Sequence, residues 1–232
     1  MAIIKLYLTQ ASAEHMEVVL VPSAADAHLE PVFPQWPFSR GALPEMDEDE
    51  QEGAYLNFLR RVTLLPNPAT FVCGDLVWGA CSADAPFHLN PEVAARFSGG
   101  KPPDRFALTA AQLLAQRSFY PLYPAASSEA GGGAGVPLEV SRLRALGMPC
   151  SPDVLLLPSR LGLPCARPVG TGTVAVNPGA LARHRAYAKV AVFPLPEALI
   201  DGVEAAGGAY VENNAPSRVC VEIEKLVRAQ EE

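Results

Sequence analysis

Two short acidic motifs contain the residue types that bind catalytic metal ions. Asp26-Ala27-His28 comes soon after a short apolar run, and a carboxylate and an imidazole from one loop can hold one ion of a two-metal centre that cleaves phosphate esters. Gly74-Asp75 begins like a second ligand loop, but Trp78 stands where the next Asp is needed. The 4 His never fall two residues apart, and none follows an Asn. We therefore predict no metal centre and no cofactor.

Motifs for a nucleophile or a phosphate loop are also incomplete. Gly170-Thr171-Gly172-Thr173 lacks the following Lys-Ser/Thr pair of a phosphate-binding loop, so we interpret it as a turn that leads into a strand. Ser23 and Ser159 each follow a Pro at the end of an apolar run, but neither lies in a G-x-S-x-G turn. The sequence therefore contains no candidate catalytic residue.

The cysteines argue against a metal or redox motif. The 5 Cys have irregular spacing and form no C-x-x-C pair, which excludes a zinc ribbon and a thioredoxin-like site. We predict reduced, mostly buried thiols in a nuclear or cytosolic protein.

Composition fits a folded domain without membrane spans. Of the 232 residues, 49% are hydrophobic and 19% charged, so the chain can bury a core without disulfides. Its apolar runs, such as Val18–Val21 and Val154–Leu157, fall far short of the roughly 20 residues that cross a bilayer, and Met1–Leu8 lack the features of a signal peptide. The net charge of −7 and the scattered basic residues predict weak or indirect DNA contact.

The 23 Pro predict many short elements joined by defined loops, because Pro is excluded from helix interiors and central strands. Short apolar or β-branched runs predict the strands, and those that end in Pro-Ser are expected to be interior. The expected strands are Val18–Val21, Val62–Leu65, Thr70–Val77, Val154–Leu157, Thr173–Val176, Ala188–Phe193 and Val219–Ile223. Asn67-Pro68 is the expected turn between the second and the third.

Two helices and two loops are also expected. Helical spacing of apolar residues predicts helices over Ile3–Glu17 and Asp104–Arg117, the second capped by Asp104. The six carboxylates in residues 45–52 indicate a solvated acidic loop, with a docking patch for a basic partner as the alternative. The Gly-, Ala- and Ser-rich residues 127–135 indicate a flexible insertion.

Three expected strands end in a polar loop with Pro or Gly. This recurrence predicts an α/β sandwich whose loops cluster at one edge of the sheet. The stretch 31–38, which interleaves Pro with aromatic residues, is expected to be an extended loop held by aromatic anchors.

Four segments, in the same order along the chain, resemble the B (accessory) subunits of DNA polymerase α–primase. Leu20–Gln35 resembles the family's VPS-x-x-D-x-H-x-x-P-V-x-P-Q segment, and Gln116–Pro124 is similar to its QRS-aromatic-YPLYP run. Pro152–Ser159 is similar to its PDVLIIPS strand, and Val176–Gly179 to its VNPG turn.

The resemblance implies a calcineurin-like phosphoesterase fold that has lost its metal ligands. It implies a non-catalytic nuclear scaffold for primer synthesis, which binds the C-terminal domain of the polymerase α catalytic subunit and, through it, primase. It also implies that residues 1–232 are the C-terminal portion of that domain, as a fragment or a short form, because the family's OB fold and N-terminal helical domain are not matched. The basic stretch after VNPG is reduced to Arg183-His184-Arg185.

The resemblance further implies that the family-signature residues are structural, while the partner-binding residues stay unidentified. The signature residues are Pro22, Ser23, Asp26, His28, Arg117, Tyr120, Pro121, Tyr123, Pro158, Ser159, Asn177, Pro178 and Gly179. Two alternative functions are a metal-dependent phosphoesterase, which the ligand count opposes, and a generic protein-interaction domain that uses the loop at 31–38.

The aromatic run after the second helix is expected to pack onto the domain. Pro121 and Pro124 hold the backbone extended, so that Phe119, Tyr120 and Tyr123 can bury their rings. The alternatives are a partner contact and a stacking platform for single-stranded DNA, which would need a basic groove.

Overall fold

The structure is a computed structural model that describes residues 16–26, 29–43, 52–93, 104–127, 135–179, 184–195 and 215–225. Its elements are β1 Val18–Leu20, η2 Arg40–Ala42, α2 Glu52–Arg60, β2 Val62–Leu64, β3 Ala69–Cys73, β4 Leu76–Ala80, α3 Ala85–Leu89, η3 Asn90–Glu92, α4 Arg105–Ala115, η4 Val140–Leu146, β5 Val154–Leu156, β6 Cys165–Val169, β7 Thr173–Asn177, β8 Ala186–Val192, α7 Ala215–Arg218 and β9 Val219–Lys225. None of the described helices is long and apolar enough to cross a membrane.

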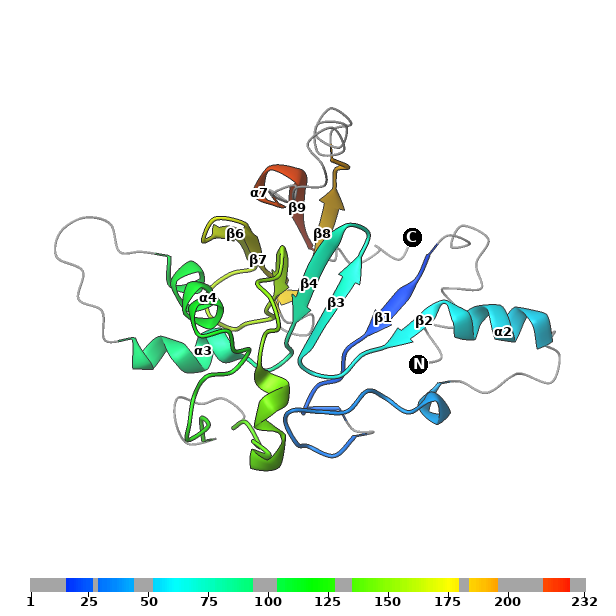
Figure 1. The fold of residues 1–232 in the computed structure, drawn as a ribbon, viewed down its shortest axis with the longest axis horizontal. Coiled ribbons are helices and arrows are strands. Elements are labelled where there is room, and N and C mark those ends of the chain that lie inside the picture. The colour runs from blue at the N-terminus through cyan, green and yellow to red at the C-terminus, as the bar shows by residue number, and fades with distance from the viewer. Residues whose placement is uncertain are drawn as a thin grey trace, which may run out of the picture.

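A five-stranded sheet forms the centre of the fold, in the order β3-β4-β5-β7-β6 (Figure 1). Strands β4, β5 and β7 are parallel, whereas the two outer strands are antiparallel to their neighbours. The carboxyl ends of β4, β5 and β7 therefore meet at one edge, and the loops that follow these strands cluster there, as predicted for the loops after β5 and β7.

Alternate residues of β5 face two different layers. Leu155 belongs to the cluster formed with α4, while Val154 belongs to the cluster on the opposite face, where the β8–β9 hairpin packs. Both residues are fully buried, and Leu157 is buried just beyond the strand. The prediction of an interior strand at Val154–Leu157 is confirmed, with the last residue in the loop.

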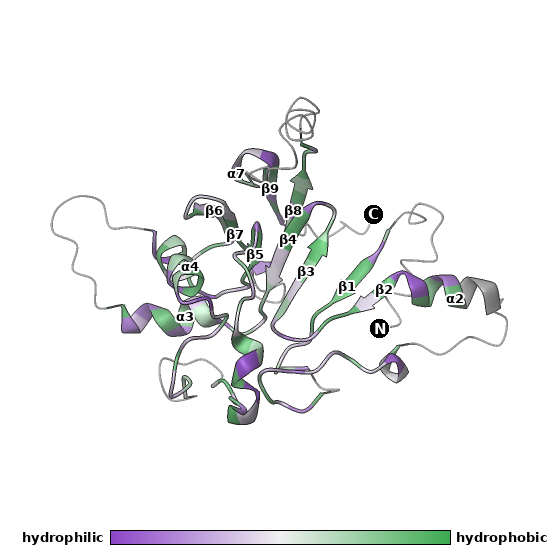
Figure 2. Ribbon diagram, viewed as in Figure 1, coloured by the Kyte–Doolittle hydropathy of each residue, from purple (hydrophilic) through white to green (hydrophobic). Residues whose placement is uncertain are grey.

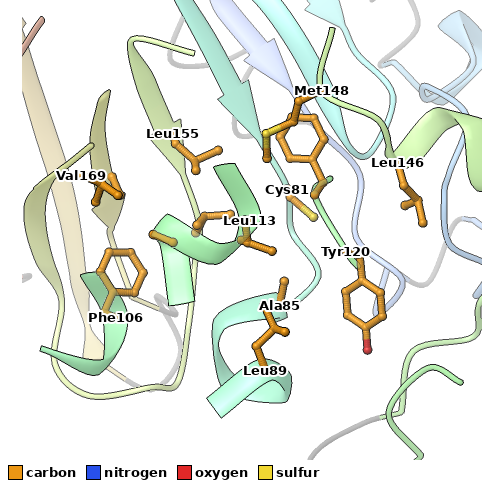
Figure 3. Close-up of a cluster of buried hydrophobic side chains, with 14 of the residues drawn as sticks. Cys81, Ala85, Leu89, Phe106, Leu113, Tyr120, Leu146, Met148, Leu155 and Val169 are labelled. Atoms are coloured by element: carbon orange, nitrogen blue, oxygen red, sulfur yellow. The ribbon is translucent and has the colours of Figure 1, made fainter. Parts of the chain in front are cut away.

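The larger cluster lies between the sheet and α4 (Figure 3). Helix α4 contributes Phe106, Ala110 and Leu113, which lie on one helix face because they are spaced by three or four residues. Leu155 and Val169 meet them from the sheet. This packing places the start of α4 beside β6 and its end beside the segment that carries the signature aromatic residues.

Helix α4 begins as predicted, at Asp104. The Ala107 amide donates to Asp104 Oδ1 at 3.1 Å, and Arg167 of β6 donates from Nε to Asp104 Oδ2 at 2.6 Å. Partial burial disfavours the Asp104 carboxylate, but the hydrogen bonds from Ala107 and Arg167 outweigh it and hold the Asp104 pKa below its usual value. One side chain thus caps the helix and ties it to the sheet.

The expectation that Val18–Val21 is an interior strand is wrong. Strand β1 pairs only with β2 among the described strands, in parallel, and Val19 is 43% exposed. Figure 2 shows hydrophobic residues along most of β1, and α2 supplies Phe58 to the small cluster beneath it. An apolar run indicates a strand, but it does not distinguish a central strand from one at the margin of the fold.

The expected strand pair around Asn67-Pro68 is also wrong. Strand β2 joins β1, and the run Thr70–Val77 is broken into β3 and β4 by a two-residue turn at Gly74-Asp75. Gly74 has a φ of 65°, which glycine adopts without a Cβ penalty. The pattern of apolar residues that indicated a strand continues beyond the turn, so only the glycine indicates where the strand is broken.

Other expected strands are confirmed with changed ends. Strand β7 gains Asn177, and β9 extends to Lys225. Strand β8 is Ala186–Val192, so it begins two residues earlier and ends one residue earlier than the expected run Ala188–Phe193. Helices α2 and α3 and strand β6 were not expected. The sequence interpretation also missed the 3-10 helices.

Several sequence expectations lie wholly or partly outside the described residues. The predicted helix over Ile3–Glu17 is described only at residues 16 and 17, which are not helical. Of the acidic loop 45–52 only Glu52 is described, and it begins α2. Of the insertion 127–135 only the two end residues are described.

The cysteines are less buried than expected. All 5 are free, but only Cys81 is buried, while Cys73 and Cys220 are exposed. Burial raises the pKa of the Cys81 thiol to about 12, so this group is an inert part of the core.

Truncation of β5 tests the two-sided burial of the sheet. Leu155→Ala is expected to lower the free energy of unfolding by about 2–5 kcal/mol, because it leaves a cavity between the sheet and α4. Leu163 is 79% exposed, so Leu163→Ala is the control and should cost less than about 0.5 kcal/mol. Urea denaturation measures both, and equal effects would contradict the assignment of Leu155 to the core.

The charge of Asp104 gives a pH-dependent prediction. Asp104→Asn keeps an N-cap acceptor and removes the ion pair with Arg167, so wild type should be more stable by less than about 1 kcal/mol. Because the folded-state pKa is depressed, this advantage is full above the unfolded-state pKa of about 3.9 and is lost as the pH falls through the lower folded-state pKa. A stability difference that stays constant from about pH 5 down to about pH 2 would contradict the ion-pair account.

Candidate functional site

Loops that follow β1, β4 and β5 line one cavity of about 430 Å³ beside the carboxyl edge of the central sheet. Ser23 comes from the first loop, Ser82 and Asp84 come from the second, and Arg160 comes from the third. The end of β7 adjoins them through Asn177, which is bonded to Ser159. The signature residues after three different strands are therefore close together in space.

Asn177 is the centre of one hydrogen-bonded group. Its Oδ1 accepts from the amides of Ser159 at 2.9 Å and Gly179 at 2.8 Å, and its Nδ2 donates to the carbonyl of Ser159 at 3.1 Å. Gly179 has a φ of 76°, and a Cβ there would lie 2.8 Å from Pro164. The loop after β7 therefore requires both the amide side chain and the glycine, with Pro178 between them.

Asp84 joins the loop after β4 to the loop after β5. Its Oδ1 accepts a short hydrogen bond from the Ser159 hydroxyl. The same oxygen accepts from the amide of Phe87 at 3.2 Å, so that Asp84 caps the start of α3. Its Oδ2 accepts from the Arg160 amide at 2.9 Å and from Arg160 Nε at 3.3 Å. The carboxylate is thus fully occupied by groups of this chain.

Asn67 is the centre of a second group, which holds the loop after β1. Its Oδ1 accepts from the Ser82 amide at 3.0 Å, and its Nδ2 donates to Ser82 Oγ at 2.7 Å and to Gln35 Oε1 at 2.9 Å. Ser82 Oγ donates to the carbonyl of Pro22 at 2.8 Å, and Gln35 Nε2 donates to that of Ser23 at 3.0 Å. Asn67 is therefore a brace between loops.

The D-x-H motif is only partly described, since residues 27 and 28, and so His28, lie outside the described ranges. Asp26 closes a local turn, because its Oδ2 accepts from the Ser23 amide at 2.7 Å. Asp75 of the second motif forms an ion pair with Arg218. Both carboxylates that suggested metal ligation thus have partners within the chain.

The signature segment after α4 divides into buried and exposed residues. Helix α4 ends at Ala115, two residues before the expected end at Arg117. Arg117 has a φ of 49°, the left-handed conformation that is typical just beyond a helix end. Phe119 and Tyr120 are buried as predicted, and the Phe119 ring packs over Gly79, where a Cβ would lie 3.2 Å from it. Pro121 is half-buried. Tyr123 is 74% exposed, so the expectation that its ring packs onto the domain is wrong.

The stretch 31–38 also contains both a buried and an exposed aromatic side chain. Phe33 is buried and its ring meets Tyr120 edge-on, which confirms one aromatic anchor. Trp36 is 68% exposed, with the Arg142 guanidinium 5.1 Å from its ring centroid, so it does not act as an anchor.

The site offers little for catalysis. The described residues contain no group of three or more His, Cys, Asp or Glu that could hold a metal ion. Pro158 and Ser159 follow β5, and the Ser159 hydroxyl is bonded to Asp84 and to the amide of Leu161. His88, whose pKa is lowered by burial, is bonded to the Tyr120 hydroxyl at 3.3 Å. The described groups therefore order loops and hold no activated nucleophile.

Sequence reasoning missed Asp84, Asn67 and Ser82. A signal for Asp84 was present, since an Asp before Ala85-Pro86 is typical of a helix start with Pro in its first turn. Asn67 was interpreted as part of a turn, and no local pattern indicated its partners 15 and 32 residues away.

Removal of the Asn177 side chain tests the brace. Asn177→Ala leaves three buried backbone groups without partners, and each such group costs about 1–3 kcal/mol, so a loss of at least about 3 kcal/mol in unfolding free energy is expected. Thr171→Ala, at an exposed position near the same strand, should change stability by less than about 0.5 kcal/mol. A loss below about 1 kcal/mol for Asn177→Ala would show that water replaces these bonds.

Comparisons with known proteins show which family the sequence matches. The family model for the B subunit of DNA polymerase alpha/epsilon matches residues 3–162. A relative from Bos taurus, named as the B subunit of DNA polymerase alpha, is 35% identical over 153 residues, which are 66% of this chain and 22% of the relative. Relatives of the same name from Rattus norvegicus and Schizosaccharomyces pombe are 33% and 31% identical over 75% and 76% of this chain.

The chain spans about a quarter of the length of the curated relatives that it matches, from 22% to 28%. The family model covers well over half of the chain, including the loops after β1 and β4 and most of the loop after β5. The chain therefore belongs to the family of B subunits of DNA polymerases alpha and epsilon.

Proposed function

We propose that this chain acts as a non-catalytic accessory subunit of the DNA polymerase alpha–primase complex. The observation that carries the proposal is the family membership, together with relatives that are named as the B subunit of DNA polymerase alpha. Its role is to hold the catalytic subunit and primase together for primer synthesis, and its place of action is the nucleus.

The proposed architecture is an inactivated phosphoesterase-type sandwich. The central sheet with layers on both faces supports it, because the parallel strands β4, β5 and β7 bring their loops to the edge where such folds place ligands. At this edge the described polar side chains bond to one another, so the loops are braced rather than arranged around an open ligand set.

The proposed partner is the C-terminal domain of the polymerase alpha catalytic subunit, and primase is reached through it. DNA contact is weak or indirect in this proposal, because the net charge of −7 opposes a phosphate-binding face. In this proposal the family-signature residues are structural, with the exception of Tyr123.

The proposal is tested by mixing the purified 232-residue chain with the C-terminal domain of the polymerase alpha catalytic subunit. We expect co-elution as a stable complex in gel filtration. A cooperatively folded chain that fails to bind this domain at micromolar concentration would contradict the proposal.

A metal-dependent phosphoesterase is the rival function, and the braced carboxylates argue against it. We expect no turnover of bis(p-nitrophenyl) phosphate with added manganese, because Asp26 and Asp75 bond within the chain. Asp26→Ala serves as the control for contaminating enzymes. Manganese-dependent turnover by wild type that is lost in this variant would establish the rival function.

A further inference from the structure

A second cavity, of about 550 Å³, lies between η3 with the end of α3 and the segment after α4. Its walls are mainly apolar, and Phe87, Leu122, Tyr123 and Pro124 contribute most of the large side chains. The braced loops of the central site do not fill it. A hollow of this size and lining can accept a large apolar side chain.

Tyr123 forms one wall and is 74% exposed. Its neighbours Phe119 and Tyr120 belong to the core cluster, whereas Tyr123 is not part of it. Exposed aromatic side chains beside an apolar hollow are the residues on which binding energy concentrates in protein interfaces.

His88 supplies a polar group at the wall of the cavity. It lines the cavity, is only 7% exposed, and its Nδ1 lies 3.3 Å from Tyr120 Oη. Tyr120 Oη already accepts from the amide of Ala126 at 3.1 Å, and the described residues contain no other acceptor for its proton. We therefore assign the hydroxyl as the donor to Nδ1, which places the imidazole proton on Nε2, and no described residue accepts a hydrogen bond from Nε2.

The charge at the rim is negative. Glu92 lines the cavity, is exposed, and forms no ion pair within the described ranges. The nearby Arg160 guanidinium, 4.7 Å from the centroid of the Phe87 ring, is already paired with Asp84. An occupant with a positive charge beside its apolar side chain therefore fits this rim best.

We propose that this cavity docks an extended segment of the polymerase alpha catalytic subunit, in which an aromatic or aliphatic side chain is flanked by Lys or Arg. The apolar side chain enters the hollow beside Tyr123, a backbone carbonyl accepts from His88 Nε2–H, and the basic residue lies against Glu92. This inference rests on the proposed function, because that function supplies the partner.

The chemistry of the cavity is tested with a probe that is independent of the partner. Acetyl-Lys-Phe-Lys-amide is titrated into the 232-residue chain, and the His88 and Tyr123 ring signals are followed by NMR. We expect saturable shifts for this peptide, at least about tenfold weaker binding to Tyr123→Ala, and weaker binding of acetyl-Glu-Phe-Glu-amide. Shifts that do not saturate, or that are unchanged in Tyr123→Ala, would overturn the proposal.

The partner is tested with the C-terminal domain of the catalytic subunit. Tyr123→Ala and Glu92→Lys should each weaken its binding, the first at least about tenfold. Trp36→Ala, which removes a similarly exposed aromatic ring outside the cavity, should leave the affinity within about twofold. Equal affinity of wild type and Tyr123→Ala would overturn the docking site and leave the proposed function standing.

The reverse result separates the two proposals. If the peptide binds as expected and the folded chain does not bind the catalytic subunit, the proposed function and the assigned occupant both fail. Self-association of the chain that is lost in Tyr123→Ala would identify a second copy as the occupant, which would also overturn the assignment.

Discussion

Burial of β5 on both faces is the constraint on which the other elements depend. A three-residue strand with no exposed face needs one layer against Leu155 and another against Val154, and α4 and the β8–β9 hairpin supply them. The pairing of β5 on both edges follows from the same burial, because all the backbone groups of an interior strand must be bonded, and its pairings with β4 and β7 are both parallel. That pairing brings the three following loops to one edge.

The loops at that edge carry polar groups close to the core, and this sets a second constraint. A buried polar group without a partner costs about 1–3 kcal/mol, and none of the buried side-chain nitrogen or oxygen atoms in the described residues lacks one. Asp84, Asn67 and Asn177 meet this demand by bonding to neighbouring loops. The same bonds make the edge a rigid scaffold and leave few free groups for a metal ion or a substrate.

The position of Tyr123 follows from how the chain leaves this core. Phe119 and Tyr120 pack into the core near η4 and α3. The chain then leaves the core, and the next aromatic side chain, Tyr123, is exposed. The Tyr120 hydroxyl also forms a hydrogen bond with His88, a side chain that lines the adjoining cavity. One signature segment therefore contributes both to the core and to the lining of a surface cavity.

Local patterns in the sequence were sufficient for the elements whose signals are local. The apolar runs of β5 and β7 end in Pro-Ser and Asn-Pro-Gly, and Asp104 caps α4 three residues from the amide it accepts. Recognition of the family also needed only short ordered segments, since four of them lie in sequence in this chain. Capping, strand patterning and short motifs each depend on neighbours along the chain, so they can be read without a structure.

Only the tertiary structure decided which residues meet across the fold. Ser159 and Asp84 are 75 residues apart, and Asn67 and Gln35 are 32 apart, so no local pattern links them. Tertiary contacts likewise placed β1 at the margin, where its apolar run resembles that of a central strand. They also buried Tyr120 and exposed Tyr123 within a single motif, because burial depends on what the rest of the chain packs against each ring.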